Sequence, residues 1–321
     1  MREPRFIQLH EVNAAPLAAE AAAGLLAPAA HVSPKFFYDA LGSRLFDAIT
    51  ELDEYYPTRT EAAIMAACQA EMVAALHQAV GTTAPTLVDL GAGNGAKAAR
   101  WFQPLGLARY VALDISVDFL RSSMGILQRQ HPHIEMSGIG LDFSADLAVP
   151  PGLVPGRAVV FYPGSSIGNF NADQALRLLR QARGLSEGGA LLIGVDLVKP
   201  KPVLEAAYDD ALGVTSAFNL NLLRHLNRLL GADFDLRQWQ HVALYDEAAS
   251  RIEMHLQARV GLTVRWPGAS RTFVPGELIH TENSYKWQPA AFEALLRDAG
   301  YAQVRTWTDP QAWFAVLVAQ G

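Results

Sequence analysis

Short apolar runs alternate with helix-like segments along most of the chain from about residue 60. The runs that predict strands are 87–90, 110–113, a run near 133–139, 158–162 and 190–195, and the helices expected among them begin at Ala96 or span 117–130 and 171–185. A further helix is expected to open at Thr58-Arg59-Thr60-Glu61, which has the spacing of a capping box, and to run to about Val80. Strands that alternate with helices in this way are typical of a mostly parallel, doubly wound α/β sheet.

The pattern changes after Lys199-Pro200-Lys201-Pro202. A helical stretch over 203–230 is followed by alternating runs at 252–260 and 262–266, which are typical of antiparallel strands. The α/β pattern resumes at Gln288. We therefore expect a second, α+β domain inserted after the fifth strand of the sheet, packed together with the N-terminal arm.

The chain ends in a predicted helix over 289–299 and two predicted strands, 303–307 and 313–319, which are joined by a turn at Thr308-Asp309-Pro310. Such a terminal pair returns the chain to the first sheet. The predicted domains are 60–198 with 287–321 for the sheet, and 12–59 with 199–286 for the inserted domain.

A glycine-rich turn, Asp89-Leu90-Gly91-Ala92-Gly93-Asn94-Gly95, lies between a predicted strand and a predicted helix. Glycines there let the chain bend sharply and let its backbone N–H groups approach a nucleotide-like ligand. Asp114 closes the next strand, where a carboxylate can bind the ribose diol of NAD or of S-adenosylmethionine (SAM). Gly91-x-Gly93-x-x-Ala96 also satisfies the dinucleotide pattern, so the turn by itself leaves both cofactors open, as well as a turn without a ligand.

Two features favour SAM over NAD. Asp89 stands two residues before the first glycine, where a carboxylate can meet the cationic amino-acid end of SAM but would face a pyrophosphate unfavourably. The terminal strand pair resembles the reversed last strand of SAM-dependent methyltransferases. The sequence therefore predicts a SAM site that includes Asp89, Gly91 and Gly93.

Composition and charge favour small-molecule chemistry. The 321 residues are 50% apolar and carry a net charge of −6, which provides no basic surface for nucleic acid. The single cysteine, Cys68, is expected to be a buried thiol, and a chain without disulfides suits the cytoplasm. Pro16 and Glu20 interrupt the Ala-rich stretch 14–30, and no uninterrupted apolar run is long enough to span a membrane. We expect a cytoplasmic monomer that binds a small molecule, with no metal site and no nucleic-acid or membrane partner.

Five short motifs are not explained by folding alone. They are Phe36-Phe37-Tyr38-Asp39, Glu54-Tyr55-Tyr56-Pro57-Thr58-Arg59, Gly164-Ser165-Ser166-Ile167-Gly168-Asn169-Phe170, Ala207-Tyr208-Asp209-Asp210 and Thr281-Glu282-Asn283-Ser284-Tyr285-Lys286. The third follows the fourth strand, at the carboxyl edge where ligands of open α/β sheets bind. Taken singly, each motif has an ordinary structural explanation as core aromatics, a turn, an acidic helix face or an edge strand.

Taken in this order, the motifs resemble those of the L-histidine Nα-methyltransferases of ergothioneine biosynthesis. The resemblance extends from about Ser33 to the C-terminus and includes Asp196-Leu197-Val198-Lys199 and Arg251-Ile252-Glu253-Met254. It implies a Rossmann-like SAM-binding sheet with a second domain that supplies much of the amino-acid pocket. The chain departs from the family pattern at Gly93-Asn94-Gly95, where relatives often carry Ser or Thr, and at Pro200, where Asp is common.

The resemblance assigns individual residues to the two ligands. It implies SAM contacts at Gly91, Lys97, Asp114 and Asp142. It implies substrate contacts at Tyr38, Tyr55, Gly164, Asn169, Tyr208, Met254, Glu282 and Ser284. The implied reaction is trimethylation of the α-amino group of L-histidine to hercynine.

The chemistry of these side chains fits that reaction. The α-amino group must be neutral to attack a sulfonium methyl, and Tyr38 and Asn169 are the candidate catalytic residues that orient it. Tyr208 is the candidate for the substrate carboxylate. Glu282 accepting from one imidazole nitrogen and Ser284 donating to the other would recognise both edges of the ring from one strand face.

Two alternatives stay open. One is an N-methyltransferase of another amino acid, such as a tryptophan derivative. Glu282 and Met254 argue against it, because an indole has only a donor and needs more room than Met254 would leave beside the ring. The other is a non-catalytic regulator that binds SAM or a nucleotide.

Overall fold

The computed structural model describes residues 3–9, 14–143 and 146–321, and they divide into two compact units. Unit 1 comprises the described residues of Met1–Glu11, Pro57–Val198 and Trp287–Gly321. Unit 2 comprises those of Val12–Tyr56 and Lys199–Lys286. Residue 12, where the inserted domain was expected to begin, lies outside the described residues.

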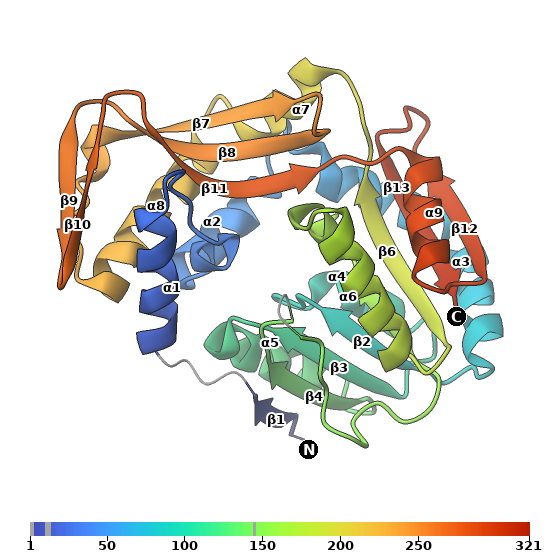
Figure 1. The fold of residues 1–321 in the computed structure, drawn as a ribbon. Coiled ribbons are helices and arrows are strands. Elements are labelled where there is room, and N and C mark those ends of the chain that lie inside the picture. The colour runs from blue at the N-terminus through green and yellow to red at the C-terminus, as the bar shows by residue number, and fades with distance from the viewer. Residues whose placement is uncertain (1–2, 10–13, 144–145) are drawn as a thin grey trace. The chain divides into compact units, whose positions relative to one another are not determined.

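Unit 1 is built on an eight-stranded sheet with the strand order β1-β4-β3-β2-β5-β6-β13-β12 (Figure 1). The order reverses between β2 and β5, as in doubly wound sheets. Adjacent strands in the part of the sheet that runs from β1 through β4, β3, β2 and β5 to β6 are parallel, whereas β13 is antiparallel to both β6 and β12. The predicted reversed last strand is therefore confirmed. The strands are β1 Arg5–Gln8, β2 Thr86–Leu90, β3 Arg109–Asp114, β4 Glu135–Gly140, β5 Val159–Tyr162, β6 Ala190–Asp196, β12 Gln303–Thr308 and β13 Phe314–Gln320.

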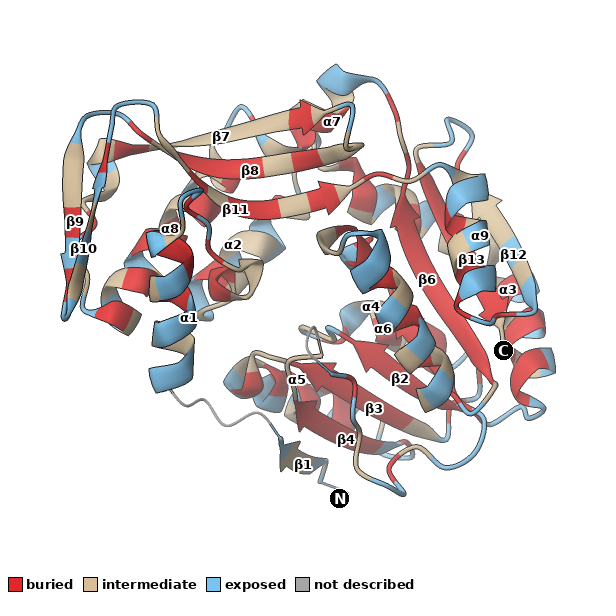
Figure 2. Ribbon diagram, in the orientation of Figure 1, coloured by how far each residue is buried: buried red, intermediate tan, exposed pale blue. Residues whose placement is uncertain are grey.

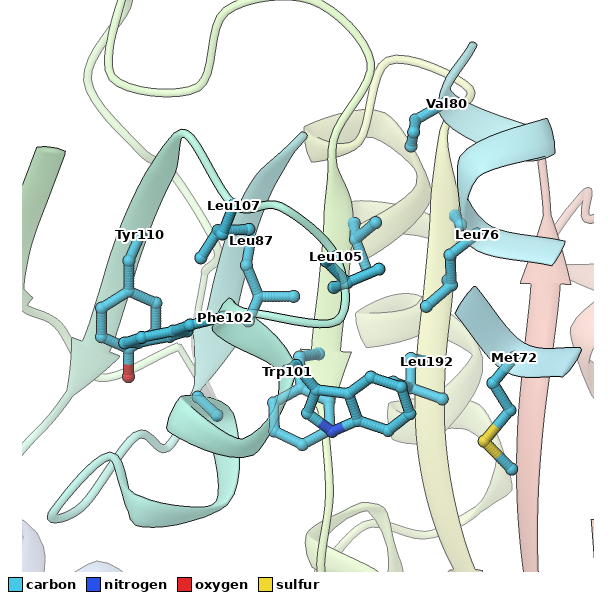
Figure 3. Close-up of a cluster of buried hydrophobic side chains, with 14 of the residues drawn as sticks. Met72, Leu76, Val80, Leu87, Trp101, Phe102, Leu105, Leu107, Tyr110 and Leu192 are labelled. Atoms are coloured by element: carbon cyan, nitrogen blue, oxygen red, sulfur yellow. The ribbon is translucent and has the colours of Figure 1, made fainter. Parts of the chain in front are cut away.

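Helices cover both faces of this sheet, because its central strands are apolar on both sides. The helices of unit 1 are α3 Tyr56–Val80, whose first residue belongs to unit 2, α4 Ala96–Phe102, α5 Val117–Gln130, α6 Ala172–Leu185 and α9 Pro289–Asp298. Buried residues of α3, α4 and α5 form one core cluster with one sheet face; Trp101, Phe102 and Met72 are among them (Figure 3). Residues of α6 and α9 form a second cluster on the other face. The predicted doubly wound α/β class is therefore confirmed.

Helix α3 begins one turn earlier than the capping-box spacing predicts. Thr58 lies inside the helix, and the Glu61 side chain contacts Lys97 and the Gly164 backbone instead, so the predicted cap is wrong. Among the described residues, α3 is the one helix long and apolar enough by composition to cross a membrane. Its residues Ile64, Met72 and Leu76 are buried against the sheet, as expected for the core helix of a folded domain.

Unit 2 contains a three-stranded antiparallel sheet in the order β11-β8-β7 and a separate hairpin, β9-β10. Its strands are β7 Trp239–Asp246, β8 Arg251–Ala258, β9 Leu262–Trp266, β10 Ala269–Phe273 and β11 Leu278–Tyr285. Its helices, apart from the first residue of α3, are α1 Ala14–Leu26, α2 Ala40–Ile49, α7 Lys201–Tyr208 and α8 Val214–Leu230. Phe218, Leu222 and Leu226 of α8 are buried with Phe37 and Met254 in one core cluster, and Figure 2 shows stretches of buried residues along β8, the strand that carries Met254.

One prediction for unit 2 is wrong in detail. The helical stretch 203–230 is two helices, because Asp209 and Asp210 end the first and the Asp210 carboxylate caps the second through Val214 N–H and Thr215 N–H. The predicted antiparallel strands in the runs 252–260 and 262–266 are confirmed, since β8 pairs antiparallel with β7 and β11, and β9 with β10. The sequence pattern also did not predict β1 or β7.

Candidate functional site

The glycine turn leaves β2 at Leu90 and enters α4 at Ala96. Gly91 and Ala92 donate backbone hydrogen bonds to the carbonyl oxygen of Leu113 at 2.9 and 3.0 Å. Gly93 has a φ of +54°, which favours glycine, and a side chain built there would meet no atom within 4 Å. The turn therefore presents its backbone to open space beside the sheet edge.

Asp89 lies beneath this turn and is only 2% exposed. Its Oδ2 accepts a 2.7 Å hydrogen bond from the Tyr110 hydroxyl, whereas Oδ1 is buried without a hydrogen-bond partner among the described residues. Burial raises the pKa of this carboxyl to about 7, although the hydrogen bond from Tyr110 works in the other direction. An unsatisfied buried carboxylate oxygen costs free energy that a cationic ligand group would recover, and this is the feature expected of a site for the ammonium group of SAM.

Asp114 at the end of β3 holds the turn in place. Its Oδ2 accepts from Gly93 N–H and its Oδ1 from Ser116 N–H, both at 2.8 Å. Burial raises the pKa of the carboxyl, and these backbone hydrogen bonds oppose the rise. The Ile115 backbone and the Ser116 side chain also hydrogen-bond to this carboxylate, so Asp114 has a structural role in the turn besides the predicted ribose contact.

Asp142 follows β4 and is half-buried. The preceding residue, Leu141, donates its N–H to the Asp114 carbonyl at 3.0 Å. The following residue, Phe143, lies 3.8 Å from the place where a Gly91 side chain would be, and its ring packs edge-on against Tyr162. The sequence did not single out Phe143, yet its ring borders the glycine turn.

Lys97 and Gly164, which the sequence assigns to different ligands, share one partner in unit 1. Glu61 Oε2 accepts from Lys97 Nζ at 2.9 Å, and Oε1 accepts from Gly164 N–H at 2.7 Å. Gly164 leads into the 3₁₀ turn Ser166–Asn169, which ends at the candidate catalytic residue Asn169. These residues lie at the carboxyl ends of β2 and β5, where the strand order reverses.

In unit 2, Tyr208, Ser284 and Lys286 form a hydrogen-bonded trio. The two hydroxyl oxygens are 2.7 Å apart, and Lys286 Nζ donates to Ser284 Oγ at 2.8 Å and to Tyr208 at 3.1 Å. Lys286 is 3% exposed, and its ammonium lies 4.7 Å from the centre of the Tyr208 ring. The trio places a buried positive charge beside two residues that the sequence assigns to the substrate.

Glu282 and Met254 are direct cross-strand neighbours on β11 and β8. Glu282 is 9% exposed and Met254 is buried. The register shifts between His280 and Glu282, and such an irregularity re-aims the side chains that follow it. The structure therefore brings the predicted acceptor and the predicted apolar neighbour of the ring together.

Tyr38 and Tyr55 are joined through aromatic contacts in unit 2. The Phe46 ring lies 5.8 Å from that of Tyr38 and 6.3 Å from that of Tyr55, and the Tyr55 ring lies 6.2 Å from that of Tyr208. These edge-on contacts fix ring orientations. Tyr38, Tyr55 and Tyr208 thus belong to one continuous aromatic cluster.

His241 holds the backbone of Tyr208. Asn219 Nδ2 donates to His241 Nδ1 at 2.8 Å, and His241 Nε2 donates to the Tyr208 carbonyl at 2.7 Å. This pattern requires the neutral tautomer with the proton on Nε2, and burial lowers the pKa of His241 accordingly. The end of α7 is therefore anchored where Tyr208 leaves it.

The chain is similar to known proteins over most of its length. The family described as "Histidine-specific methyltransferase, SAM-dependent" matches residues 17–321. The histidine N-alpha-methyltransferase of Mycolicibacterium smegmatis is 42% identical over 304 residues, which is 92% of each chain, and that of Mycobacterium tuberculosis is 40% identical over 89% of each chain. The ergothioneine biosynthesis protein 1 of Neurospora crassa is 29% identical over 84% of this chain and 31% of its own length.

The chain belongs to the SAM-dependent histidine-specific methyltransferase family. Its cofactor is SAM, which confirms the preference for SAM over NAD. The buried Oδ1 of Asp89 and the open space at Gly93 fit this cofactor. Among the residues that the structure describes, no group of three or more His, Cys, Asp or Glu side chains is placed to hold a metal ion.

The predicted site residues of this methyltransferase divide between the two units. Unit 1 carries the SAM residues with two of the substrate residues, namely Asp89, Gly91, Gly93, Lys97, Asp114, Asp142, Gly164 and Asn169. Unit 2 carries Tyr38, Tyr55, Tyr208, Met254, Glu282 and Ser284. Contacts join several members within each unit: Gly93 with Asp114 and, through Glu61, Lys97 with Gly164 in unit 1, and Tyr208 with Ser284 and Glu282 with Met254 in unit 2.

The trio restricts what Tyr208 and Ser284 can do in this methyltransferase. Their mutual hydrogen bond uses one of the two hydroxyl protons, so at most one proton remains to point outward. Ser284 donating to a ring nitrogen and Tyr208 donating to a carboxylate therefore exclude each other while that bond persists. The buried Lys286 ammonium lies beside both hydroxyl groups.

Sequence reasoning missed Glu61, Lys286, Tyr110 and Phe143. Lys286 stood at the end of one of the five motifs, two residues beyond the part on which the resemblance rests, and no other signal in the sequence marked it. Tyr110 and Phe143 look like ordinary core aromatics in sequence. Glu61 carried a misleading signal, because its spacing from Thr58 suggested a cap.

Proposed function

We propose that this chain transfers three methyl groups from SAM to the α-amino group of L-histidine and so produces hercynine in ergothioneine biosynthesis. The observation that carries the proposal is the pairing of Glu282 with Met254 next to the Tyr208–Ser284–Lys286 trio. It combines an acceptor, a donor, a cation and an apolar surface within a few residues of one strand. Relatives that are 42% and 40% identical over 92% and 89% of their own length bear the name histidine N-alpha-methyltransferase.

The roles of the residues follow from the reaction. SAM supplies a methyl group from its sulfonium, and the chain must present a neutral amine in line with it. Tyr38 and Asn169 orient the amine, and Asn169 is set by the 3₁₀ turn that follows β5. Lys286 holds the carboxylate, and Tyr208, which hydrogen-bonds to Ser284, positions that hydroxyl beside it. No metal takes part in this proposal.

Recognition of the ring depends on Glu282 and Ser284. A neutral imidazole has one donor and one acceptor nitrogen, so Glu282 accepts from the first and Ser284 donates to the second. In this arrangement Tyr208 donates to Ser284, and the Lys286 ammonium rather than the Tyr208 proton binds the carboxylate. A substrate without the ring nitrogens leaves buried polar groups unpaired, at about 1–3 kcal/mol each.

An N-methyltransferase of a tryptophan derivative is the second candidate. An indole offers a donor to Glu282 but no acceptor to Ser284, and it needs more space beside Met254. A regulator that binds SAM without turnover is the third candidate. We further propose that the protein acts as a monomer in the cytoplasm, without nucleic-acid or membrane partners, in keeping with its net charge of −6 and its single cysteine.

Mass spectrometry of the purified protein with SAM and a panel of amino acids tests the proposal. Histidine should gain one, two and finally three methyl groups, and α-N-methyl- and α-N,N-dimethylhistidine should also be converted. Glu71→Gln, on an exposed position of α3, is a matched variant that should behave like the wild type. Methylation of a tryptophan derivative with histidine left unmodified would overturn the histidine assignment, and no methylation of any amino acid would favour the regulator.

A further inference from the structure

Glu61 is a buried carboxylate that the reaction as described above does not use. It is 1% exposed and lies in the first turns of α3. Both of its oxygens are engaged, one by the Lys97 ammonium at 2.9 Å and the other by Gly164 N–H at 2.7 Å. A buried charge persists only when it is paired and hydrogen-bonded, and both of these partners belong to the predicted ligand sites.

The fold leaves room for this carboxylate at a specific place. A Cβ at Gly194 of β6 would lie 2.0 Å from Glu61 Oε1, so any larger residue there would displace the carboxylate. On its other side, a Cβ at Gly164 would lie 3.0 Å from Lys97 Nζ. The absence of a side chain at Gly194 thus leaves space for the carboxylate, and its absence at Gly164 leaves space for the Lys97 ammonium.

Lys97, the first partner of Glu61, belongs to the predicted cofactor site. It lies in the first turn of α4, directly after the glycine turn, and its side chain is 39% exposed while that of Glu61 is 2% exposed. The Lys97 ammonium is therefore held on its buried side by Glu61, and on its exposed side it can donate to a ligand. The predicted partner there is SAM.

Gly164, the other partner of Glu61, belongs to the predicted binding site of the amino-acid substrate. Its N–H is fixed by Glu61, and the next residue, Ser165, takes a left-handed conformation with a φ of +59° and accepts a 2.8 Å hydrogen bond from Asp196 N–H through its Oγ. Ser165 also accepts from Gly168 N–H at 2.8 Å. The segment that leads to Asn169 is therefore held at Gly164 and at Ser165.

The connection through Glu61 lies where the strand order of the sheet reverses, between β2 and β5. Ligands of open α/β sheets bind at this point. Because the one carboxylate of Glu61 hydrogen-bonds to both Lys97 and Gly164, ordering of one ligand site can order the other through it. Coupling of this kind is a difference in binding free energy and must be reciprocal.

We propose that Glu61 is a positioning residue that couples SAM binding at Lys97 to amino-acid binding at the Gly164–Asn169 segment. The inference rests on the proposed function, because it requires both ligands. The hydrogen bonds from Lys97 and Gly164 to Glu61 are present without ligand; SAM binding restrains the Lys97 ammonium further, and through Glu61 the Gly164 N–H opens less often before the amino acid arrives. Histidine binding at the Gly164–Asn169 segment then orders the same three groups, Gly164, Glu61 and Lys97, in the reverse order.

Glu61→Gln tests this coupling. The glutamine carbonyl can still accept from Gly164 N–H, but its NH₂ group faces the Lys97 ammonium, where two donors meet. Calorimetry should measure histidine affinity with and without S-adenosylhomocysteine, and S-adenosylhomocysteine affinity with and without histidine. In the wild type each ligand should tighten the other by the same factor, about tenfold or more. In Glu61→Gln that factor should fall below about threefold, whereas Glu71→Gln on the same helix should keep it.

A second measurement uses the wild type alone and so does not depend on the variant folding. Hydrogen exchange at the Gly164 amide should slow when S-adenosylhomocysteine binds in the absence of histidine. An unchanged coupling factor in a folded Glu61→Gln, or an unchanged Gly164 exchange rate, overturns the role of Glu61. A wild type that binds S-adenosylhomocysteine but not histidine overturns the proposed substrate instead, so the two failures are distinguishable.

Discussion

Substitution of Asp89 by asparagine should stabilise the ligand-free protein while weakening SAM binding. The pKa of Asp89 rises from an ordinary 3.8 to about 7 on folding, chiefly through burial. At about 1.4 kcal/mol per pH unit, this rise corresponds to a cost of at most about 4 kcal/mol for the ionised form. The cost is absent below pH ~4, where the carboxyl is protonated in both states. It grows as the pH rises from 3.8 to about 7 and is complete above that value.

Asparagine imitates the protonated carboxyl and can still accept the hydrogen bond from Tyr110. Urea denaturation without SAM should therefore give Asp89→Asn a free energy of unfolding about 2–4 kcal/mol above that of the wild type at pH 8. The difference should shrink by more than half at pH 5, because the wild-type carboxyl is then mostly protonated in the folded state. SAM affinity, measured by calorimetry at pH 8, should fall by about 10- to 150-fold, as expected for the loss of a hydrogen bond to a charged group.

Asp298→Asn is the matched control, because Asp298 is an exposed carboxylate of the same unit. Its stability relative to the wild type should change little between pH 5 and pH 8. The reasoning about Asp89 is refuted if Asp89→Asn is no more stable than the wild type at pH 8, or if the difference in stability does not depend on pH. Unchanged SAM affinity in Asp89→Asn would refute the assignment of Oδ1 to the cofactor.

Three further substitutions test unit 2. Lys286→Met should raise the KM for histidine about 5- to 50-fold and leave the SAM affinity unchanged. The control Lys201→Met, at an exposed lysine of α7, should leave the KM unchanged. A KM for histidine that is the same in Lys286→Met and in the wild type would exclude Lys286 from carboxylate binding. Glu282→Ala should lower kcat/KM for histidine by ~1–3 kcal/mol in transition-state binding, and untouched kinetics would contradict ring recognition by Glu282. Asp39 caps α2 through Gly42 N–H, and hydrogen bonds from Gly42 and Asn221 lower its pKa against the effect of burial. Asp39→Ala should therefore cost about 1–2 kcal/mol of stability at pH 7 and progressively less as the pH falls through the pKa of Asp39 in the folded state; a constant loss would disprove the ionic contribution.

The sequence by itself determined the fold class, the cofactor and the family. The periodic patterns of strands and helices depend on residues two to four positions apart in the sequence. The alternation of strands and helices from 87–90 to 190–195 could therefore be predicted without coordinates. The glycine turn and Asp89 are also local, because strand, turn and helix are consecutive in the chain. The candidate substrate residues came from motifs, and their assignment to ligands remains a prediction.

Only the tertiary structure decided which polar groups meet. Glu61 and Thr58 have the spacing of a cap, but burial of Glu61 against Lys97 and Gly164, 36 and 103 residues away, outweighs a local hydrogen bond. The hydrogen bonds that join Tyr208, Ser284 and Lys286 are 2.7 to 3.1 Å long, and Ser284 and Lys286 lie 76 and 78 residues from Tyr208 in sequence. Long-range contacts between buried polar groups carry no periodic signal, since each depends on how distant elements pack rather than on the sequence around either partner.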